Sequence, residues 1–334
     1  MKRLKLRLSV YYNSSDVNAL KMVRTTFHNR PAVQLENADL RVTVLATGGH
    51  IAEILHKRSG VSPLWIPPWT DEESVDFGDN CETGLLRGIM GHNVCLDLFG
   101  PPSDAEAAAG GVAHSEGGIV PYEFEARDGG LIARCVLKCS QLSFERSMIL
   151  EGHRVKIMET VGNLSVFDRP IAWTQHVTLG PPFLEPNETR FHASATKSMA
   201  MEGSAHIALE HCSGPGASGG YTTYLMDPNS EKAWFIAFSP GLKVAAGFVW
   251  RRSDFPWMGI WEENCSRKHS PWNGRTLARG MEFGVSPFPE TRRRMIERGT
   301  LFDTPCYCWI EAKARLSVEY YAAITQADTM PESL

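Results

Sequence analysis

The chain has 334 residues, of which 43% are apolar and 22% are charged. These proportions are typical of a globular protein with a sizeable core, and they exclude a disordered chain. The formal net charge is −4 and the basic residues are scattered along the sequence, so we expect no nucleic acid as a partner. No run of about 20 apolar residues is present, so we expect no membrane association through a spanning helix.

Two segments are predicted: an irregular N-terminal segment over residues 1–25 and a single β-rich domain over residues 26–334. The first residues, MKRLKLRLSVYY, are basic, but charges interrupt their apolar stretch, so they do not form a signal-peptide core. The eight cysteines lack the paired CxxC spacing of a zinc site. We therefore expect a cytoplasmic protein with reduced, mostly buried thiols, and a monomer or a homodimer.

Short strands separated by Gly, Pro, Asn and Asp follow from residue 32 onward. Leu40, Val42 and Val44 alternate with polar residues, and a Gly-Gly pair at 48–49 separates them from a second apolar run, which predicts a hairpin. Only two short segments, 103–111 and 291–299, have a helical pattern, and residues 213–220 read as a surface loop. Further strands are predicted over 131–141, 142–152 and 153–163, as a meander, and over 223–227, 233–240, 243–251 and 314–324. The pattern predicts an all-β fold with few short helices.

His176 lies in the middle of a strand-like run, PIAWTQHVTLGPPFL. An imidazole between apolar neighbours must be hydrogen-bonded or functional, because a buried polar group without a partner costs about 1–3 kcal/mol. A structural histidine and a catalytic histidine both fit this pattern.

A second histidine, His114, lies in the glycine-rich segment GGVAHSEGG. If this segment is extended, the side chains of His114 and Glu116 project from the same face. A structural role is again the competing interpretation.

Glu282 lies among apolar residues in MEFGVSPFP, just before a proline-rich turn. Burial of a carboxyl raises its pKa towards the range of a useful general base. An ion pair with Arg279 is the competing structural explanation.

Four tryptophans lie between residues 250 and 272, interleaved with carboxylates, amides and arginines. Flat apolar rings suit the CH faces of a sugar, and planar polar groups suit its hydroxyls. The cluster therefore indicates a carbohydrate site, and a core position is the competing interpretation for each ring taken alone.

At these residues the chain resembles the aldose 1-epimerase, or galactose mutarotase-like, superfamily. The stretch LENADLRVTVLATGGHIAEILHKRSGVSPLWIPPW is similar to its first hairpin, and AWTQHVTLG is similar to the strand that carries its second histidine. The order His114, His176, Glu282 matches its order of catalytic residues. The resemblance extends from about residue 31 to the C-terminal strand, and it implies a large antiparallel supersandwich whose concave face holds a sugar.

The resemblance also implies the chemistry. Glu282 takes the proton of the anomeric hydroxyl and His176 protonates the ring oxygen, so that the ring opens and recloses on either face; His114 binds hydroxyls or polarises the ring oxygen. No cofactor and no metal are required. The residues expected to bind the sugar are Arg87, Trp173, Trp257, Trp261, Glu262, Glu263, Trp272 and Arg279.

The sequence departs from the superfamily pattern in two places. The acid usually found between the second histidine and the base has no clear counterpart, with Asp227, Glu262 and Glu263 as candidates, and His114 is followed by Ser-Glu rather than by Gly. Beyond these two places, the tryptophan-rich stretch around residues 250–272 looks unlike that of a simple hexose mutarotase, so an unusual sugar, a sugar phosphate or an oligosaccharide stays open as substrate. Two other functions also stay open: a noncatalytic carbohydrate-binding protein on the same fold, and a metal-dependent sugar lyase or isomerase with His114, Glu116, His176 and Glu282 as ligands.

Overall fold

The computed structural model describes residues 22–332, so residues 1–21 of the predicted irregular segment lie outside the described residues. Within the described part, Val23–Phe27 forms the first strand, β1, and pairs with the strand that follows. The predicted boundary at residue 25 is therefore wrong for residues 23–25. They belong to the β-structure, because their backbone groups bond to the next strand.

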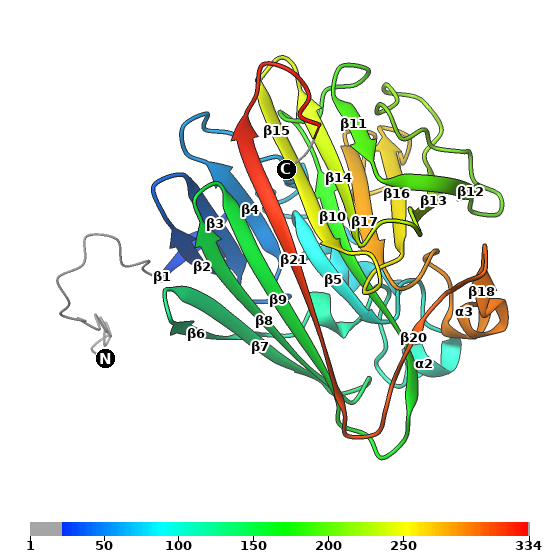
Figure 1. Cartoon of the computed structure of the whole chain (residues 1–334). Helices are drawn as coiled ribbons and strands as arrows, with labels where there is room; N and C mark the ends of the chain where they lie inside the picture. Colours follow the sequence, from blue (N-terminus) through cyan, green and yellow to red (C-terminus); the bar gives the residue numbers. More distant parts are fainter. Residues whose placement is uncertain (1–21, 333–334) are drawn as a thin grey trace.

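Two large antiparallel sheets make up most of the molecule (Figure 1), as the sequence predicts. The first has 11 strands, with β1 at one end and β12 at the other, and β20 pairs with β10 outside this order. In spatial order its strands are β1 (Val23–Phe27), β2 (Arg30–Glu36), β3 (Leu40–Leu45), β4 (Ile51–His56), β5 (His92–Asp97), β10 (Arg169–Leu179), β17 (Leu277–Gly284), β16 (Trp257–Asn264), β13 (Gly220–Met226) and β12 (Ala195–Ala200), with β20 at Cys308–Ile310.

The second sheet has eight strands, and the long strand β21 runs through its middle between β15 and β9 (Figure 1). The meander predicted over residues 131–163 is confirmed, since β7, β8 and β9 are neighbours in sequence and in space. In spatial order the strands are β11 (Arg190–Ala193), β14 (Lys232–Ser239), β15 (Val244–Arg251), β21 (Arg315–Gln326), β9 (Arg154–Asn163), β8 (Leu142–Glu151), β7 (Gly130–Leu137) and β6 (Glu123–Arg127). A separate two-stranded sheet joins β18 (Thr300–Leu301) to β19 (Thr304–Pro305).

The main core lies between the two large sheets. Along β8 every second side chain is buried, which is the period expected of a strand with one face on the core. Trp250 of β15 stacks on Phe283 of β17 at 4.1 Å between ring centroids, so large rings from both sheets interlock. By contrast, β10 is buried on both faces from residue 171 onward. One face of β10 contacts this core, and the other is free to carry a site.

Helices are few and short. Both predicted helices are confirmed, as α2 (Asp104–Ala108) and α3 (Arg292–Arg298), and a third, α1 (Thr83–Leu86), was not predicted. A single 3₁₀ turn, η1, spans Glu116–Gly118. In residues 22–332 we find no helix of the length and apolarity needed to cross a membrane. The eight cysteines all lie in this range and are free thiols, four of them buried.

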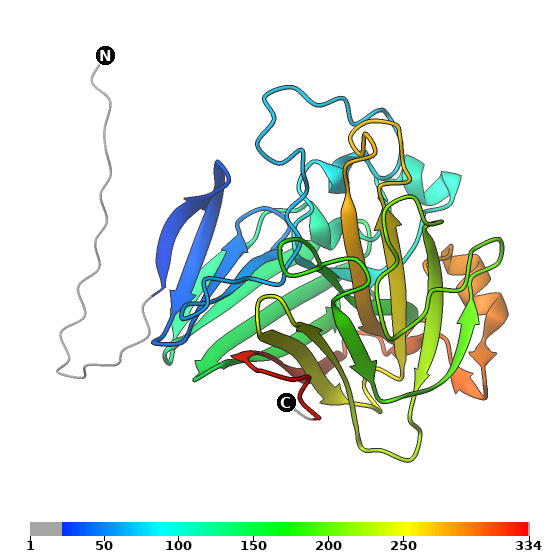
Figure 2. The same ribbon diagram turned by 90° about the horizontal axis from the view of Figure 1, so that it is seen from above.

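Two long loops extend side by side beyond the strand ends of the larger sheet (Figure 2). One connects β4 to α1 over residues 57–82, and the other connects β16 to β17 over residues 265–276. An ion pair between Arg275 and Glu72, at 2.7 Å, joins them. These loops form a wall above the outer face of β10 and β17.

Candidate active site

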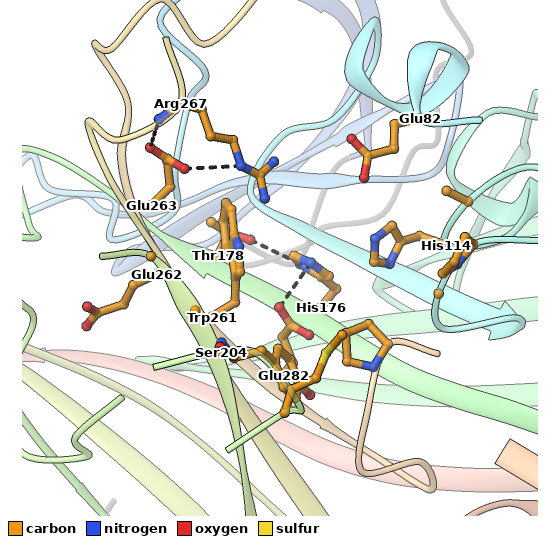
Figure 3. A pocket seen from close by; sticks show the side chains of 18 of the residues that line it. Glu82, His114, His176, Thr178, Ser204, Trp261, Glu262, Glu263, Arg267 and Glu282 are labelled. Atoms are coloured by element: carbon orange, nitrogen blue, oxygen red, sulfur yellow. Dashed lines mark hydrogen bonds and ion pairs between the residues drawn. The ribbon is translucent and has the colours of Figure 1, made fainter. Parts of the chain in front are cut away.

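Two neighbouring strands, β10 and β17, form the floor of the candidate site. Their register places His176 directly opposite Glu282, and opposite side chains of an antiparallel pair project from the same face. His176 Nε2 lies 3.1 Å from Glu282 Oε1 (Figure 3). This is a hydrogen-bond distance, so a proton can pass between the imidazole and the carboxyl.

The second ring nitrogen of His176 faces Thr178, two positions along the same strand and therefore on the same face. His176 Nδ1 lies 3.1 Å from Thr178 Oγ1. A hydroxyl both donates and accepts hydrogen bonds. Thr178 therefore supports either tautomer of the imidazole, whichever nitrogen carries the proton.

Burial sets the charge of this pair. Glu282 is 3% exposed, and burial raises the pKa of its carboxyl to about 8. Burial, followed by the nearby His114, lowers the pKa of His176 to about 3. Both shifts disfavour charge in a site with little water. Around neutral pH the two side chains together therefore hold one proton, which is lost near pH 8.

Gly280 makes room for the carboxylate of Glu282. A Cβ atom on Gly280, two positions earlier on the same strand, would lie 2.5 Å from Glu282 Oε1. Any side chain at Gly280 would have to displace the carboxylate. The space that brings Glu282 towards His176 is thus built into the backbone of β17.

His114 reaches the same site from the loop before η1. Its backbone has a positive φ of 58° and that of Ser115 a φ of 88°, conformations that are unfavourable for residues other than glycine. The ring of His114 lies 5.6 Å from that of His176, nearly perpendicular to it. Cys95 Sγ is 3.6 Å from His114 Nδ1, so the Nε2 side of the ring is left for other partners.

A cavity of about 570 Å³ opens above these three residues, within the usual size range for small-molecule sites. Tryptophans form one wall. Trp65 and Trp272 lie nearly parallel with their ring centroids 6.3 Å apart, and Trp261 lies 6.1 Å from Trp272. The cavity therefore combines a polar floor with an aromatic side, as sugar recognition requires.

One arginine enters this wall from the β16–β17 loop. The Arg267 guanidinium lies 4.5 Å from the Trp272 ring centroid, and its Nε is 3.2 Å from Glu263 Oε2. The backbone of Arg267 also donates to Glu263 Oε1 at 3.0 Å. Ion pairing and stacking fix the guanidinium at the cavity edge, where it can donate to a ligand (Figure 3).

The structure brings most of the predicted site residues to this one cavity. Its lining contains the three predicted catalytic residues and four of the predicted sugar-binding residues: His114, His176, Glu282, Trp261, Glu262, Glu263 and Trp272.

Three of the other predicted sugar-binding residues do not line the cavity. Arg87 caps α1 and lies over the ring of Phe77 in a separate hollow. Trp173 faces the core between the sheets, because on β10 it has the opposite parity to His176. Trp257 is fully buried and donates to the Pro305 carbonyl at 2.8 Å.

Arg279 is also absent from the lining. Its buried guanidinium pairs with Glu262, so the competing explanation of Glu282 as the partner of Arg279 is wrong. Arg279 also donates to the His211 carbonyl at 2.7 Å. Glu262 is thereby tied to a structural network, although its residue borders the cavity.

The expected common face of His114 and Glu116 is wrong, because the positive φ angles between them turn the chain. Glu116 Oε1 accepts a hydrogen bond from the Ser140 amide at 3.1 Å and lines a second hollow. The four ligands of the metal-dependent alternative therefore do not converge. Within residues 22–332, no group of three or more His, Cys, Asp or Glu side chains is placed to hold a metal ion.

Three residues were candidates for the acid that the superfamily has between its second histidine and its base. Two of them line the cavity, and one lies elsewhere. Asp227 accepts hydrogen bonds from Asn229 in an exposed turn and does not line the cavity. Of the two glutamates that do, Glu262 is held by Arg279 and Glu263 by Arg267.

Among the lining residues that sequence reasoning missed are Glu82, Thr178, Tyr221 and Arg267. Thr178 had a usable signal, since it lies two positions from His176 on a predicted strand. Arg267 lies four residues after Glu263 in a loop, where spacing carries no information. Glu82 is the N-cap residue of α1, the helix that was not predicted.

No protein-family profile and no curated protein matches the sequence. Solved structures do match the fold. They include a provisionally assigned aldose 1-epimerase from Klebsiella pneumoniae (TM-score 0.69, 13% identity, covering 90% of this chain and 80% of the other). A galactose mutarotase-like protein from Clostridium acetobutylicum also matches (TM-score 0.65, 12% identity, 92% and 99% coverage), as does one from Lactobacillus casei (TM-score 0.59, 12% identity, 88% and 100% coverage).

The chain therefore has the galactose mutarotase-like fold, which confirms the predicted fold class and the predicted resemblance at the level of fold. At these identities the likeness shows the fold alone, since one fold hosts many functions.

Proposed function

We propose that this protein is a carbohydrate-binding isomerase that interconverts the anomers of a sugar, with Glu282 as general base and His176 as general acid. The observation that carries the proposal is the 3.1 Å contact between His176 Nε2 and Glu282 Oε1 at the floor of a cavity with a tryptophan wall. In an aldopyranose the anomeric hydroxyl and the ring oxygen are bonded to the same carbon. The acid and the base that act on them must therefore be close neighbours.

The reaction can proceed with one proton on the pair. At rest this proton lies on Glu282, which has the higher pKa of the two, and it must first pass to His176 across their 3.1 Å contact. Glu282, now a carboxylate, takes the proton from the anomeric hydroxyl, the bond between C1 and the ring oxygen breaks, and protonated His176 gives its proton to the ring oxygen. The product is the open-chain aldehyde. The pair now has a protonated Glu282 and a neutral His176, so it still holds one proton.

Ring closure then runs the same steps in reverse after rotation about the bond between C1 and C2. His176 takes the proton of the chain hydroxyl as its oxygen attacks C1, and Glu282 returns a proton to the carbonyl oxygen. Each positioned proton-transfer group typically contributes a factor of about 10²–10⁴ in rate. Thr178 supports both states, because its hydroxyl can match either tautomer of His176.

The rival function, a noncatalytic sugar-binding protein, would use the same aromatic wall. It does not explain why His176 and Glu282 lie in contact at the floor of the cavity. What favours an enzyme is that two buried titratable groups lie within hydrogen-bond distance of each other and that burial shifts the pKa of both, since strongly perturbed groups in a cavity are candidates for acid-base chemistry. The test is to add the protein to freshly dissolved α-anomers of glucose, galactose and their 6-phosphates and to follow relaxation by NMR or polarimetry. A His176→Asn variant serves as comparison. Equal rates with wild type, with His176→Asn and without protein would overturn the proposal.

The reaction rate should depend on pH through the shared proton. The one-proton pair persists up to the raised pKa of about 8 for Glu282, and above it both groups are deprotonated and His176 has no proton to give. We expect kcat/KM to be level from pH 6 to 7.5 and to fall about tenfold per pH unit above pH 8. A pH series checks this, with the uncatalysed rate subtracted. A rate that rises through pH 8 would mean that the free carboxylate alone is the active form.

The tryptophan wall should contribute to affinity. Trp261 is half-buried, and its ring faces the cavity beside His176, 6.3 Å between centroids. Trp261→Ala is expected to raise KM about tenfold with a smaller change in kcat, because stacking contributes about 0.5–1.5 kcal/mol beyond buried area. Trp309 is 58% exposed and does not line the cavity, so it provides the control variant Trp309→Ala, which should leave KM unchanged. An unaltered KM in Trp261→Ala would mean that this ring does not contribute to sugar binding.

A further inference from the structure

The phenol of Tyr221 is a buried polar group of the cavity that lacks a hydrogen-bond partner among the described residues. Tyr221 lies on β13 and is 5% exposed, yet its side chain lines the cavity. Its hydroxyl has no hydrogen-bond partner among residues 22–332. A buried hydroxyl normally forms a hydrogen bond, because leaving it unpaired is unfavourable.

The backbone of the neighbouring strand is shaped to receive this hydroxyl. A Cβ atom on Gly259 of β16 would lie 1.7 Å from Tyr221 Oη and 2.3 Å from Cζ, so the end of the ring rests on bare backbone. Phe99 and Phe288 hold the ring from the sides, with centroids 6.1 Å and 6.2 Å away. The position of the phenol is therefore fixed by packing and not by a polar contact.

This position places Tyr221 in a row with the acid and the base. The registers pair His176 with Glu282 and Glu282 with Gly259 across three adjacent strands, β10, β17 and β16. The Tyr221 hydroxyl lies over Gly259, on the side of Glu282 away from His176. The order across the floor is thus His176, Glu282, Tyr221.

A pyranose has the same order of oxygens around its anomeric carbon. C1 carries O1 and is flanked by the ring oxygen on one side and by C2 on the other. With the ring oxygen at His176 and O1 at Glu282, the hydroxyl on C2 faces Tyr221. Burial raises the pKa of Tyr221 well above its ordinary value, so the phenol keeps its proton and can donate it in a hydrogen bond.

From this row of contacts we infer that Tyr221 binds the C-2 hydroxyl of the sugar, so the site selects aldoses with a free hydroxyl at C-2 over 2-deoxy sugars. The inference rests on the proposed function for the placement of the sugar, and it adds a specificity-determining residue to that function.

The experiment compares D-glucose and D-galactose with their 2-deoxy counterparts, in binding by calorimetry and in anomer exchange by NMR. Wild type should prefer the parent sugar about tenfold, the contribution of one hydrogen bond between uncharged groups. Tyr221→Phe should reduce this ratio to about one by weakening the parent sugar alone. Because the lost hydroxyl has no partner in the protein, the variant should melt no lower than wild type.

A matched control is present on the same strand. The Tyr224 hydroxyl donates to the Ile207 carbonyl at 2.5 Å and lies outside the cavity lining, so Tyr224→Phe should keep the tenfold ratio. A ratio that persists in Tyr221→Phe would overturn the inference while leaving anomer exchange intact. A ratio lost as expected, on a protein that binds but does not exchange anomers, would uphold the contact and overturn the isomerase. Absence of binding by all four sugars would overturn both.

Discussion

Glu282→Gln is expected to lower kcat for anomer exchange by a factor of about 10²–10⁴, the usual contribution of a positioned general base. Glutamine has nearly the same shape as glutamate, so the pocket and the fold should persist. It cannot accept the proton of the anomeric hydroxyl, and it cannot share a proton with His176, 3.1 Å away. Exchange rates measured by NMR at saturating sugar, together with sugar affinity by calorimetry, check the expectation. Affinity should change far less than rate.

The matched control for this variant is Glu202→Gln. Glu202 also lines the cavity, but its side chain is 90% exposed, and it has no place on the floor. This variant should keep the wild-type rate. Equal rates in wild type and Glu282→Gln would favour the noncatalytic sugar-binding protein, whose affinity does not need the carboxylate.

The same substitution should change stability in a pH-dependent way. The folded-state pKa of Glu282, about 8, is raised above its unfolded value. The contribution of this group to stability is therefore full below the unfolded pKa and is lost as pH rises through about 8. Glutamine does not titrate. Glu282→Gln should thus melt several degrees above wild type at pH 8.5, and this difference should shrink towards pH 5. A constant difference across this range would contradict the raised pKa.

The second large effect is expected in the core, on the opposite face of β10. Glu159 and Arg146 are fully buried between the sheets, with Arg146 Nε 2.8 Å from Glu159 Oε1. Glu159 also accepts hydrogen bonds from Trp173 Nε1 at 3.0 Å and from the Tyr320 hydroxyl at 2.8 Å. Arg146→Ala leaves this carboxylate buried without its counter-charge. We expect a loss of about 3–5 kcal/mol in the free energy of unfolding, measured by urea denaturation at pH 7.

Two exposed ion pairs made by one arginine on the adjacent strand provide the comparison. Arg134 of β7 pairs with Glu125 and Glu145 at 2.6 Å each, but these side chains are 34–52% exposed. Because solvent screens such pairs, Arg134→Ala should cost no more than about 1 kcal/mol. A similar cost for both variants would mean that the buried network contributes no more than an exposed one.

Much of the fold follows from local sequence patterns. The hairpin of β3 and β4, the meander of β7 to β9 and both predicted helices were found from alternation, glycine positions and capping residues. These signals are local, because the side-chain period of a strand and the break at a glycine depend on neighbouring residues alone. Helix α1 has only four residues, too few for helical periodicity to emerge.

The site was predicted in part. His114, His176 and Glu282 were singled out because polar groups among apolar residues need a reason, and their order resembles a known superfamily. The tryptophans were harder to assign. Trp261 and Trp272 border the cavity, whereas Trp173 and Trp257 lie in the interior, and composition gives no means of separating these two sets.

The sequence by itself determined that this chain forms antiparallel strands, where most of them lie, and which three residues are candidates for acid-base chemistry. The tertiary structure alone decided that His176 meets Glu282, that Arg87 lies elsewhere, and that Tyr221 is left without a partner beside them. The physical reason lies in β10, which is buried on both faces from residue 171 onward. Its sequence carries no alternation to distinguish the core side from the cavity side, so only the pairing of strands distant in sequence assigns each side chain to one or the other.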